Sequence, residues 1–298
     1  MTRALYNAML AEAAIEIRHR LGLASDETVE TAIVLGTGWG DAFPLEATRT
    51  ANMAEIAAFQ GLEEMVGHKR RFEIGTVEVS APKRPTLRPR TPRSGATLNI
   101  PTETRRVIVL RGRIHMNEGT LNPSVLLKVR LQIDVLIEMG VTKFLLTAAV
   151  GSLREDLLPG SIVIIDRFIS FGQDQMPNYP GEFVSIDNAM NRAMVANLNF
   201  PHVSHVFFCG PHFESGDDKA EMARRGADVV GMSVKPEVFT VAVARVFGGH
   251  PDVSVLALGY VSNGMDEQMD DEKHRQRALK DAPQLAEAIM QALTRWTD

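Results

Sequence analysis

The chain has 298 residues, 45% of them hydrophobic, and a formal net charge of −5. This length can bury a full core, and the composition is that of a soluble globular protein. The acidic balance argues against a general nucleic-acid or membrane-surface binder, and no apolar run is long enough for a membrane helix. The single cysteine, Cys209, excludes an intrachain disulfide and suits a reducing, cytoplasmic location.

Apolar runs alternate with amphipathic segments along the chain. Residues 4–23 place apolar side chains at helical spacing, and a short apolar strand then leads into a glycine-rich turn at 36–40. Further strands are expected at 107–110, 144–150, 161–166, 205–209, 228–232 and 253–261. Further helices are expected at 123–140, 217–226, 236–248 and 272–296. The alternation predicts an α/β fold with a largely buried central sheet.

One stretch, at 81–106, differs from the rest because it is rich in proline and arginine and poor in apolar residues. Its basic charge could meet nucleic acid, but a solvated insertion is the better explanation. We expect an extended, mobile loop rather than a second domain. Strong apolar segments on both sides favour one domain.

The letters LGTGWG at 35–40 follow the first apolar strand. A strand that ends in a glycine turn lets backbone N–H groups approach a phosphate, and Thr37 adds a hydroxyl donor. A structural turn explains the same letters, because the third glycine of the dinucleotide-binding pattern is absent. A second basic loop, GHKR at 67–70, offers His68 but is also typical of a solvated turn.

The apolar run at 107–110 continues directly into RGRIHMNEG. If the strand continues, Arg111, Arg113 and His115 share one face, since alternate residues of a strand point the same way. Such a cluster of donors and positive charge favours an anion. The alternative is an arginine that is paired with a carboxylate such as Glu118.

The block GPHFES at 210–215 follows another expected strand. It sets Phe213 beside Glu214, so an aromatic face could stack on a heterocycle while the carboxylate accepts hydrogen bonds from ring N–H groups. The alternative is a helix start in which Glu214 complements the dipole.

Two further strand ends carry polar side chains. Met232 and Ser233 precede a helix that Pro236 opens, and Ser233 either donates to an anion there or is an ordinary cap. Asn263 ends the last strand with an amide that offers a donor and an acceptor, although Asn-Gly is also a common turn pair. Polar groups thus follow successive strands, and ligands bind at that edge of an open α/β sheet.

The order of these motifs resembles the trimeric purine nucleoside phosphorylase family, which includes methylthioadenosine phosphorylases. The resemblance spans about residues 30–290. Its blocks are GTG at 36–38, GH at 67–68, GRIHMNEG at 112–119, TAAVGS at 147–152, GPHFES at 210–215, GMSVKPE at 231–237, SN at 262–263 and His274. It implies one domain, residues 1–298, with a central mixed β-sheet flanked by helices, and a homotrimer.

The resemblance also implies roles for individual residues. Phosphate would be held by Thr37, His68, Arg113, His115, the amide of Ala149 and Ser233. The nucleoside would be held by Asn117, Phe213, Glu214, Met232, Asn263 and, at the 5′ end of the sugar, His274. Catalysis would depend on Asn263, Glu214 and His115.

These roles predict phosphorolysis of 6-oxopurine nucleosides and deoxynucleosides, giving free base and the pentose 1-phosphate. Phosphate is the co-substrate, and the leaving purine gathers negative charge that a donor at N7 must stabilise. Asn263 suits that role, and its amide can also donate to O6. An aspartate there would instead accept from a 6-amino group. No cofactor or metal is expected, and no nucleic-acid or membrane partner.

Several positions depart from the family pattern. Asn117 stands where the family has a tyrosine, Ala148 replaces an asparagine, and Ser152 replaces a glycine. Residues 69–71 add basic charge next to the expected phosphate loop. Two other hypotheses therefore stay open: a methylthioadenosine-type phosphorylase, against which Asn263 counts, and a catalytically silent relative that binds nucleosides or anions.

Overall fold

The computed structural model describes residues 1–40, 42–43, 45–63, 69–80, 102–119, 122–170, 176, 178–267 and 270–296. The strands in this part of the chain are β1 (Thr31–Leu35), β2 (Glu46–Asn52), β3 (Arg71–Ser80), β4 (Thr102–Arg111), β5 (Lys143–Ser152), β6 (Ile162–Ile169), β7 (His202–Phe207), β8 (Val229–Gly231) and β9 (Ser254–Asn263). The helices are α1 (Arg3–Leu21), α2 (Pro123–Glu138), α3 (Arg192–Ala196), α4 (Gly216–Arg224), α5 (Lys235–Phe247), α6 (Asp271–Lys280) and α7 (Ala282–Arg295). Short 3-10 turns lie at η1 (Met53–Glu55), η2 (Ala57–Phe59), η3 (Met116–Gly119) and η4 (Ile186–Ala189).

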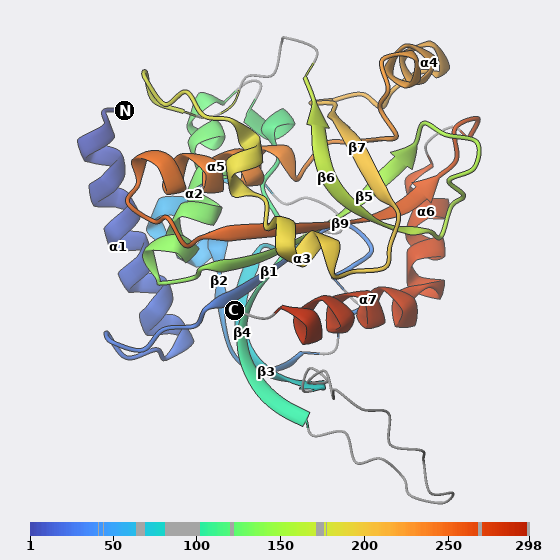
Figure 1. Ribbon diagram of the computed structural model, residues 1–298. Helices are drawn as coiled ribbons and strands as arrows, with labels where there is room; N and C mark the ends of the chain where they lie inside the picture. The colour runs from blue at the N-terminus through green and yellow to red at the C-terminus, as the bar shows by residue number, and fades with distance from the viewer. Residues whose placement is uncertain are drawn as a thin grey trace, which may run out of the picture.

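The strands form one mixed sheet in the order β2-β3-β4-β1-β5-β8-β7-β6-β9 (Figure 1). β1 is parallel to β4 and β5, whereas β3 is antiparallel to β2 and β4. β5 pairs with β8 and also with β9, so β5, β8, β7, β6 and β9 close into a ring. The predicted single α/β domain with a mixed sheet is confirmed.

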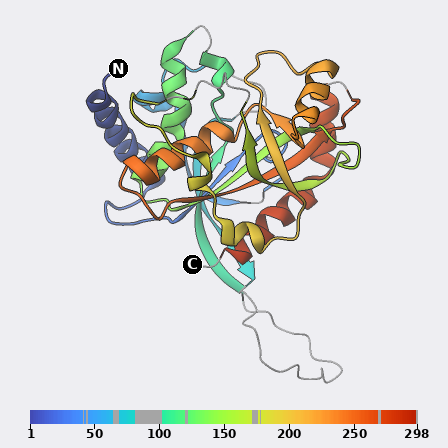
Figure 2. The same cartoon turned by 45° about the horizontal axis from the view of Figure 1, so that its top comes forward.

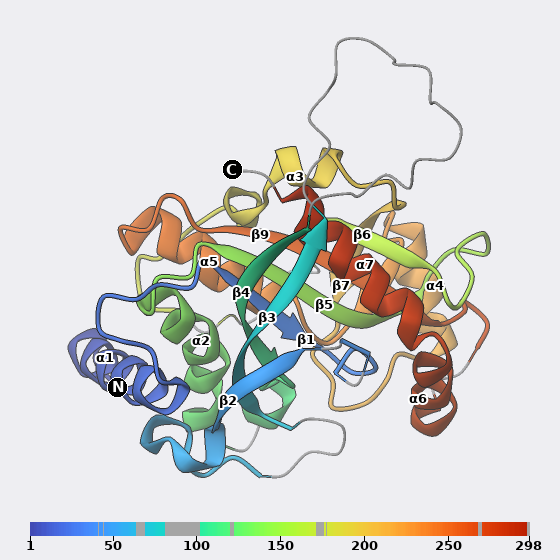
Figure 3. The same ribbon diagram turned by 90° about the horizontal axis from the view of Figure 1, so that it is seen from below.

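Helices cover the sheet in two groups. α1, α2 and α5 lie together on one side, and α6 and α7 lie on the other (Figure 2). Seen from below, α7 crosses beside β3 (Figure 3). The central strand β1 has four fully buried apolar residues after Thr31, because it has neighbours on both edges and helices on its faces. This burial leaves the loops at the carboxyl ends of the strands as the open part of the fold.

Two strands were not expected from the sequence, and one expected helix is two. β2 and β3 are half polar, so they lack the apolar run of a buried strand, yet they pair antiparallel at the edge of the sheet. The segment 272–296 divides into α6 and α7 at Asp281, close to Pro283, which lies in the first turn of α7.

The prediction of a loop over residues 81–106 is wrong for residues 102–106. Residues 102–106 belong to β4 and pair with β3, from Thr102 opposite Ser80 to Arg106 opposite Thr76. A polar segment can form a strand when a partner satisfies its backbone groups, and composition alone does not reveal the partner. Residues 81–101 lie outside the described residues. Among the helices of the described residues, none combines the length and apolarity needed to cross a membrane.

Candidate active site

A cavity of about 520 Å³ opens at the carboxyl ends of the strands. Its wall is built from the segments that follow β1, β4, β7 and β8, from β5, and from the end of β9. The predicted site residues that line it are Thr37, Arg113, His115, Asn117, Ala149, Phe213, Glu214, Met232, Ser233 and Asn263. The expectation that polar groups at successive strand ends lie in one pocket is therefore confirmed.

The glycine turn after β1 is pressed against β5. The N–H of Gly36 donates to Thr147 Oγ1 at 3.1 Å, and a Cβ on Gly36 would lie only 2.7 Å from the Thr147 carbonyl oxygen. The buried Trp39 donates from Nε1 to the Ala148 carbonyl at 3.1 Å. These contacts fix the turn against β5, and the turn also places Thr37 at the cavity wall.

The segment after β4 corrects one expectation. The strand ends at Arg111, and Gly112 turns the chain with a φ of 87°, so Arg111, Arg113 and His115 do not share a strand face. Arg111 instead donates from Nε to Glu73 Oε2 at 2.9 Å. Because Gly112 redirects the chain, Arg113 and His115 reach the cavity. Arg111 instead links β4 to β3 through Glu73.

Arg113 forms a buried, charged part of the cavity wall. It is 1% exposed, its Nη1 lies 3.1 Å from Glu237 Oε1, and its Nη2 donates to the Thr147 carbonyl. Burial lowers the pKa of Arg113, and Glu237 opposes that shift. An arginine paired with a carboxylate was one alternative for this motif, and the carboxylate is Glu237 rather than Glu118. The pair holds the guanidinium in place beside the cavity.

His115 is held by Glu118 and, through it, by Arg70. The backbone N–H of His115 donates to Glu118 Oε1 at 2.7 Å, and the ring Nδ1 of His115 lies 3.4 Å from the same oxygen. Arg70 Nη2 donates to the other oxygen. Burial raises the pKa of Glu118, but its hydrogen bonds with His115 and the charge of Arg70 outweigh burial and lower it. Arg70 of the basic loop therefore orients His115 indirectly.

Glu214 and Asn263 meet over Gly151 at the other end of the cavity. A Cβ on Gly151 would lie 3.1 Å from Glu214 Oε1 and 3.2 Å from Asn263 Nδ2, so a larger residue there would press on both side chains. Asn263 is 1% exposed, and Ser262 Oγ lies 3.0 Å from its Oδ1, where it can donate. The amide nitrogen of Asn263 donates one N–H to the Glu267 carbonyl at 3.5 Å, and its second N–H can serve as a donor to a ligand. Asn263 is therefore more than a turn residue.

Glu214 is separate from the helix that follows it. Ser215 caps α4 through reciprocal bonds with Asp218, and the Glu214 carboxylate lies at the cavity wall beside Gly151. Burial raises the pKa of Glu214, although nearby Lys219 opposes the shift. Lys219 also donates from Nζ to the Glu267 carbonyl at 2.9 Å, which ties α4 to the loop after β9.

The wall between the two ends carries Asn117, Met232 and Ser233. Asn117 Nδ2 lies 3.8 Å from Met232 Sδ, so these two side chains form one surface. Ser233 does not cap α5, because the N-cap is Val234, which has a φ of 72° and makes no side-chain cap. The ordinary-cap alternative for Ser233 is therefore wrong, and its hydroxyl lies at the cavity instead.

Two predicted residues are left. His68 lies outside the described residues, and His274 is not among the residues that line the cavity. His274 is 4% exposed, burial lowers its pKa, and neither ring nitrogen has a hydrogen-bond partner among the described residues. The same helix, α6, lines the cavity with Glu272 and Arg275, which sequence reasoning missed. Helical spacing was the available signal, since residues three apart share a face.

Comparison with known proteins identifies the family of the chain. The sequence model described as Phosphorylase superfamily matches residues 30–294. Purine nucleoside phosphorylase of Mycobacterium bovis is 33% identical over 175 residues, which are 57% of this chain and 61% of that protein. S-methyl-5′-thioadenosine phosphorylase of Pyrococcus furiosus is 37% identical over 123 residues, 37% of this chain and 48% of that protein. The chain thus spans less than two thirds of the length of these relatives.

A solved structure shows the same fold. Isoform 2 of purine nucleoside phosphorylase from Schistosoma mansoni, in complex with cytosine and ribose-1-phosphate, superposes with a TM-score of 0.72. The two chains are 21% identical, and the superposition covers 97% of each. The fold is therefore shared over nearly the whole chain.

Proposed function

Because the chain belongs to the phosphorylase superfamily, we propose that it is a purine nucleoside phosphorylase that uses inorganic phosphate to cleave 6-oxopurine nucleosides. One observation carries the proposal. A single cavity has a buried guanidinium, Arg113, at one end and a buried amide with a carboxylate, Asn263 and Glu214, at the other. The first end suits an anion and the second suits a heterocycle with ring N–H groups.

Phosphate binds at the first end in this proposal. Arg113 supplies the charge, His115 a ring that Glu118 orients, and Thr37 and Ser233 supply hydroxyl donors. Bound inorganic phosphate is the co-substrate, and the reaction uses no other cofactor. A phosphate dianion beneath the sugar also stabilises the positive charge that develops on the ribose ring as the glycosidic bond breaks.

The base binds at the second end. Glu214 accepts a hydrogen bond from a ring N–H, and Phe213, 44% exposed at the cavity wall, packs on the base. A phosphate oxygen forms a bond to the anomeric carbon as the bond from that carbon to N9 breaks, and the electron pair of the broken bond goes to the purine. Asn263 donates to N7 and stabilises that developing negative charge.

Asn263 also sets the preference between bases. Its amide can donate to the oxygen of a 6-oxopurine, whereas a carboxylate would accept from a 6-amino group. Asn263→Asp should therefore shift the ratio of kcat/KM for inosine to that for adenosine toward adenosine by about 10–100-fold, since a site built for one hydrogen-bond pattern disfavours the other. Both nucleosides are assayed with saturating phosphate. An unchanged ratio would remove this account of base recognition.

The function itself is tested by mixing the protein with inosine, with and without phosphate. Release of hypoxanthine and ribose 1-phosphate only when phosphate is present is the expected result. Guanosine and adenosine are assayed in parallel. If none of the three nucleosides releases its base, the proposal is wrong, and the silent nucleoside-binding alternative gains support from any binding seen by calorimetry.

A methylthioadenosine-type phosphorylase is the second candidate, favoured by the identity to the Pyrococcus furiosus protein. Asn263 counts against it, because the amide does not match a 6-amino group. Turnover of inosine compared with methylthioadenosine decides between the two. The homotrimer and the cytoplasmic location are also proposed, from the resemblance and the cysteine content. A molar mass from light scattering and fractionation of cells would check them.

A further inference from the structure

One buried lysine, Lys219, lies next to the base end of the cavity. It belongs to α4 and is 4% exposed, and with Met222 three residues later it forms the buried side of that helix. Burying an ammonium group is costly unless acceptors or opposite charges surround it. The groups around Lys219 therefore indicate what it does.

The ammonium group of Lys219 is bound by the turn that follows β9. Nζ donates to the carbonyls of Gly264 at 3.1 Å, Met265 at 3.3 Å and Glu267 at 2.9 Å. An ammonium group has three hydrogens, so these three carbonyls account for all of them. The Glu267 N–H closes the turn by donating to the Gly264 carbonyl at 3.3 Å. Lys219 therefore fixes the backbone of residues 264–267.

The same turn holds the side chain of Asn263. Asn263 Nδ2 donates to the Glu267 carbonyl at 3.5 Å, and this carbonyl also accepts the shortest of the Lys219 hydrogen bonds. Asn263 and Lys219 thus share one acceptor. The Glu267 carboxylate pairs with Lys273 and Arg277 of α6, which hold the turn from that helix. The orientation of the Asn263 amide therefore depends on a turn that Lys219 holds from α4.

The charge of Lys219 also acts on Glu214. Burial raises the pKa of Glu214, the positive charge of Lys219 opposes that shift, and the nearby Asp218 adds to it. Glu272 and Arg275 of α6 line the same cavity, but they pair with each other at 2.7 Å. Lys219 therefore favours the ionised form of Glu214, which is the form that accepts a hydrogen bond from a ring N–H.

Resting on the proposed function, we propose that Lys219 is a positioning residue for the base: it places Glu214 and Asn263 for a purine without contacting the purine itself. Lys219 is not among the residues that line the cavity, and its three N–H groups are used by the turn. One ammonium group in this way supports both the carboxylate that accepts from the ring and the amide that donates to N7. The phosphate end is held separately, by Glu237 at Arg113.

Lys219→Met tests the proposal, because it removes the charge and the three donors but keeps an unbranched side chain. The kcat/KM for inosine should fall about 10–100-fold, since Asn263 is no longer held in place for the base. The KM for phosphate should stay close to the wild-type value. The acid limb of the kcat/KM profile, where activity falls at low pH, should move to higher pH, since Glu214 loses the charge that favours its ionised form. A purely structural lysine would lower activity without moving the limb.

Two further variants separate the charge of Lys219 from its effect on folding, and urea denaturation checks that each is folded. Lys219→Arg keeps the positive charge, so its acid limb should stay near the wild-type pH. Lys219→Gln lacks the charge but keeps a donor for the turn, so its limb should move to higher pH even if the methionine variant does not fold. A limb at the wild-type pH in either folded uncharged variant, or one displaced equally in Lys219→Arg, would overturn the proposal.

A matched control is Lys273, which pairs with Glu267 of the same turn and has a side chain that is 55% exposed. Lys273→Met should leave the acid limb in place, and a limb displaced as in Lys219→Met would overturn the proposal. If the wild type cleaves no nucleoside, the proposed function fails instead. Calorimetry with hypoxanthine then tests Lys219 without turnover. Lys219→Met should bind it about 10-fold more weakly, and equal affinities, or no binding by either protein, would overturn the inference.

Discussion

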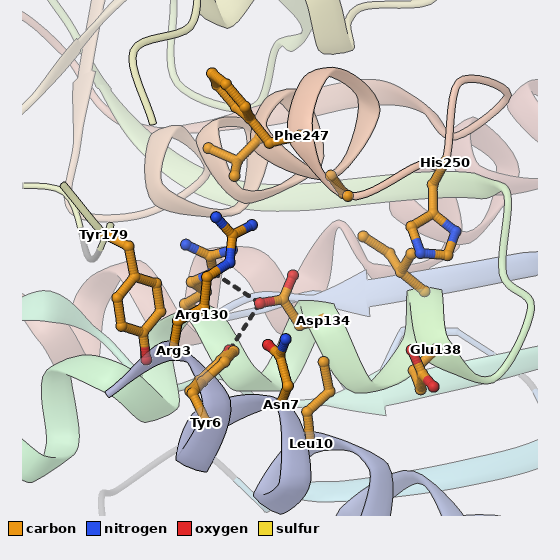
Figure 4. A pocket seen from close by; sticks show the side chains of 14 residues that line it. Arg3, Tyr6, Asn7, Leu10, Arg130, Asp134, Glu138, Tyr179, Phe247 and His250 are labelled. Atoms are coloured by element: carbon orange, nitrogen blue, oxygen red, sulfur yellow. Dashed lines mark hydrogen bonds and ion pairs between the residues drawn. The ribbon is translucent and has the colours of Figure 1, made fainter. Parts of the chain in front are cut away.

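Two cavities in this protein differ in what their charged groups contact. The second cavity, about 350 Å³, lies among α1, α2, α5 and Tyr179 (Figure 4). There Arg130 donates from Nε to Asp134 at 2.7 Å and from Nη1 to Glu182 at 2.6 Å, and the Tyr6 hydroxyl donates to Asp134 at 2.7 Å. These charges satisfy one another and join the helices.

The active-site cavity is arranged differently. Glu118 holds His115 and Glu237 holds Arg113 at the cavity wall, while Ser262 engages the oxygen of Asn263 and leaves its nitrogen as a donor. Supporting residues therefore fix the lining groups in position for a ligand. Cavity volume alone therefore does not identify a binding site. The active-site cavity differs because supporting residues behind its wall hold the lining groups toward the cavity, whereas the charges of the second cavity pair with one another.

Arg130→Ala should have the largest effect, and on stability. It leaves the buried Asp134 without its cation and Glu182 with only the half-exposed Arg3, which lowers the free energy of unfolding by about 3–5 kcal/mol. Urea denaturation measures this, and kcat/KM of the folded protein should stay close to the wild-type value. Arg224→Ala removes the exposed pair with Glu221 and should change the free energy of unfolding far less, because solvent screens an exposed pair. A large loss of activity in folded Arg130→Ala would show that the second cavity also serves the reaction, which would contradict the structural role assigned to it.

Glu214→Gln should have the opposite profile, with lower activity and little change in stability. Losing a charged acceptor for the base should lower kcat/KM for inosine about 10–100-fold, which corresponds to a charged hydrogen bond. Burial raises the pKa of Glu214. As the pH falls, its carboxylate is therefore protonated at a pH above the usual glutamate pKa of about 4.3. The wild-type kcat/KM should therefore fall on the acid side.

The pH profile of the Glu214→Gln variant should lack that acid limb, since glutamine does not titrate. Glu221→Gln, on the exposed face of α4, should give a profile parallel to the wild type. An acid limb of equal steepness and midpoint in Glu214→Gln would assign it to another group and weaken the proposed contact with the base.

Tyr6→Phe should have the smallest effect. It removes one hydrogen bond to Asp134 but leaves Arg130 paired with that carboxylate, so the free energy of unfolding should fall by about 1 kcal/mol. Burial and the neighbouring Asp134 raise the pKa of Tyr6, so its hydroxyl stays protonated and donating in the folded protein. Thermal unfolding measures the change. A loss of activity larger than the loss of stability would link this cavity to the reaction.

Residues that follow the apolar strands were largely predictable from the sequence. Thr37 and Glu214 lie in the loops that follow β1 and β7, and Asn263 ends β9, so each could be found from a recognisable strand. The partners that hold them were not predictable. Glu237 lies far along the chain from Arg113, and nothing in local spacing connects them.

Local pattern failed where the surroundings of an element decide its form. β3 is half polar and the first half of β4 is polar, and pairing with neighbouring strands makes them strands. On α6 the sequence motif favoured His274, but the packing of Ala278 on Gly38 sets the rotation of the helix and presents Glu272 and Arg275 instead. The rotation of a helix depends on what it packs against, and a motif does not contain that information.

The sequence by itself determined the α/β class, the order of the apolar strands and of most helices, and which chemical groups follow those strands, because these depend on periodicity and on residues adjacent in the chain. Only the tertiary structure decided which of those groups face a common cavity, which carboxylate holds each cation, and which face of α6 lines the cavity. Those outcomes depend on contacts between residues far apart in the chain, where packing and electrostatics act across elements rather than along them.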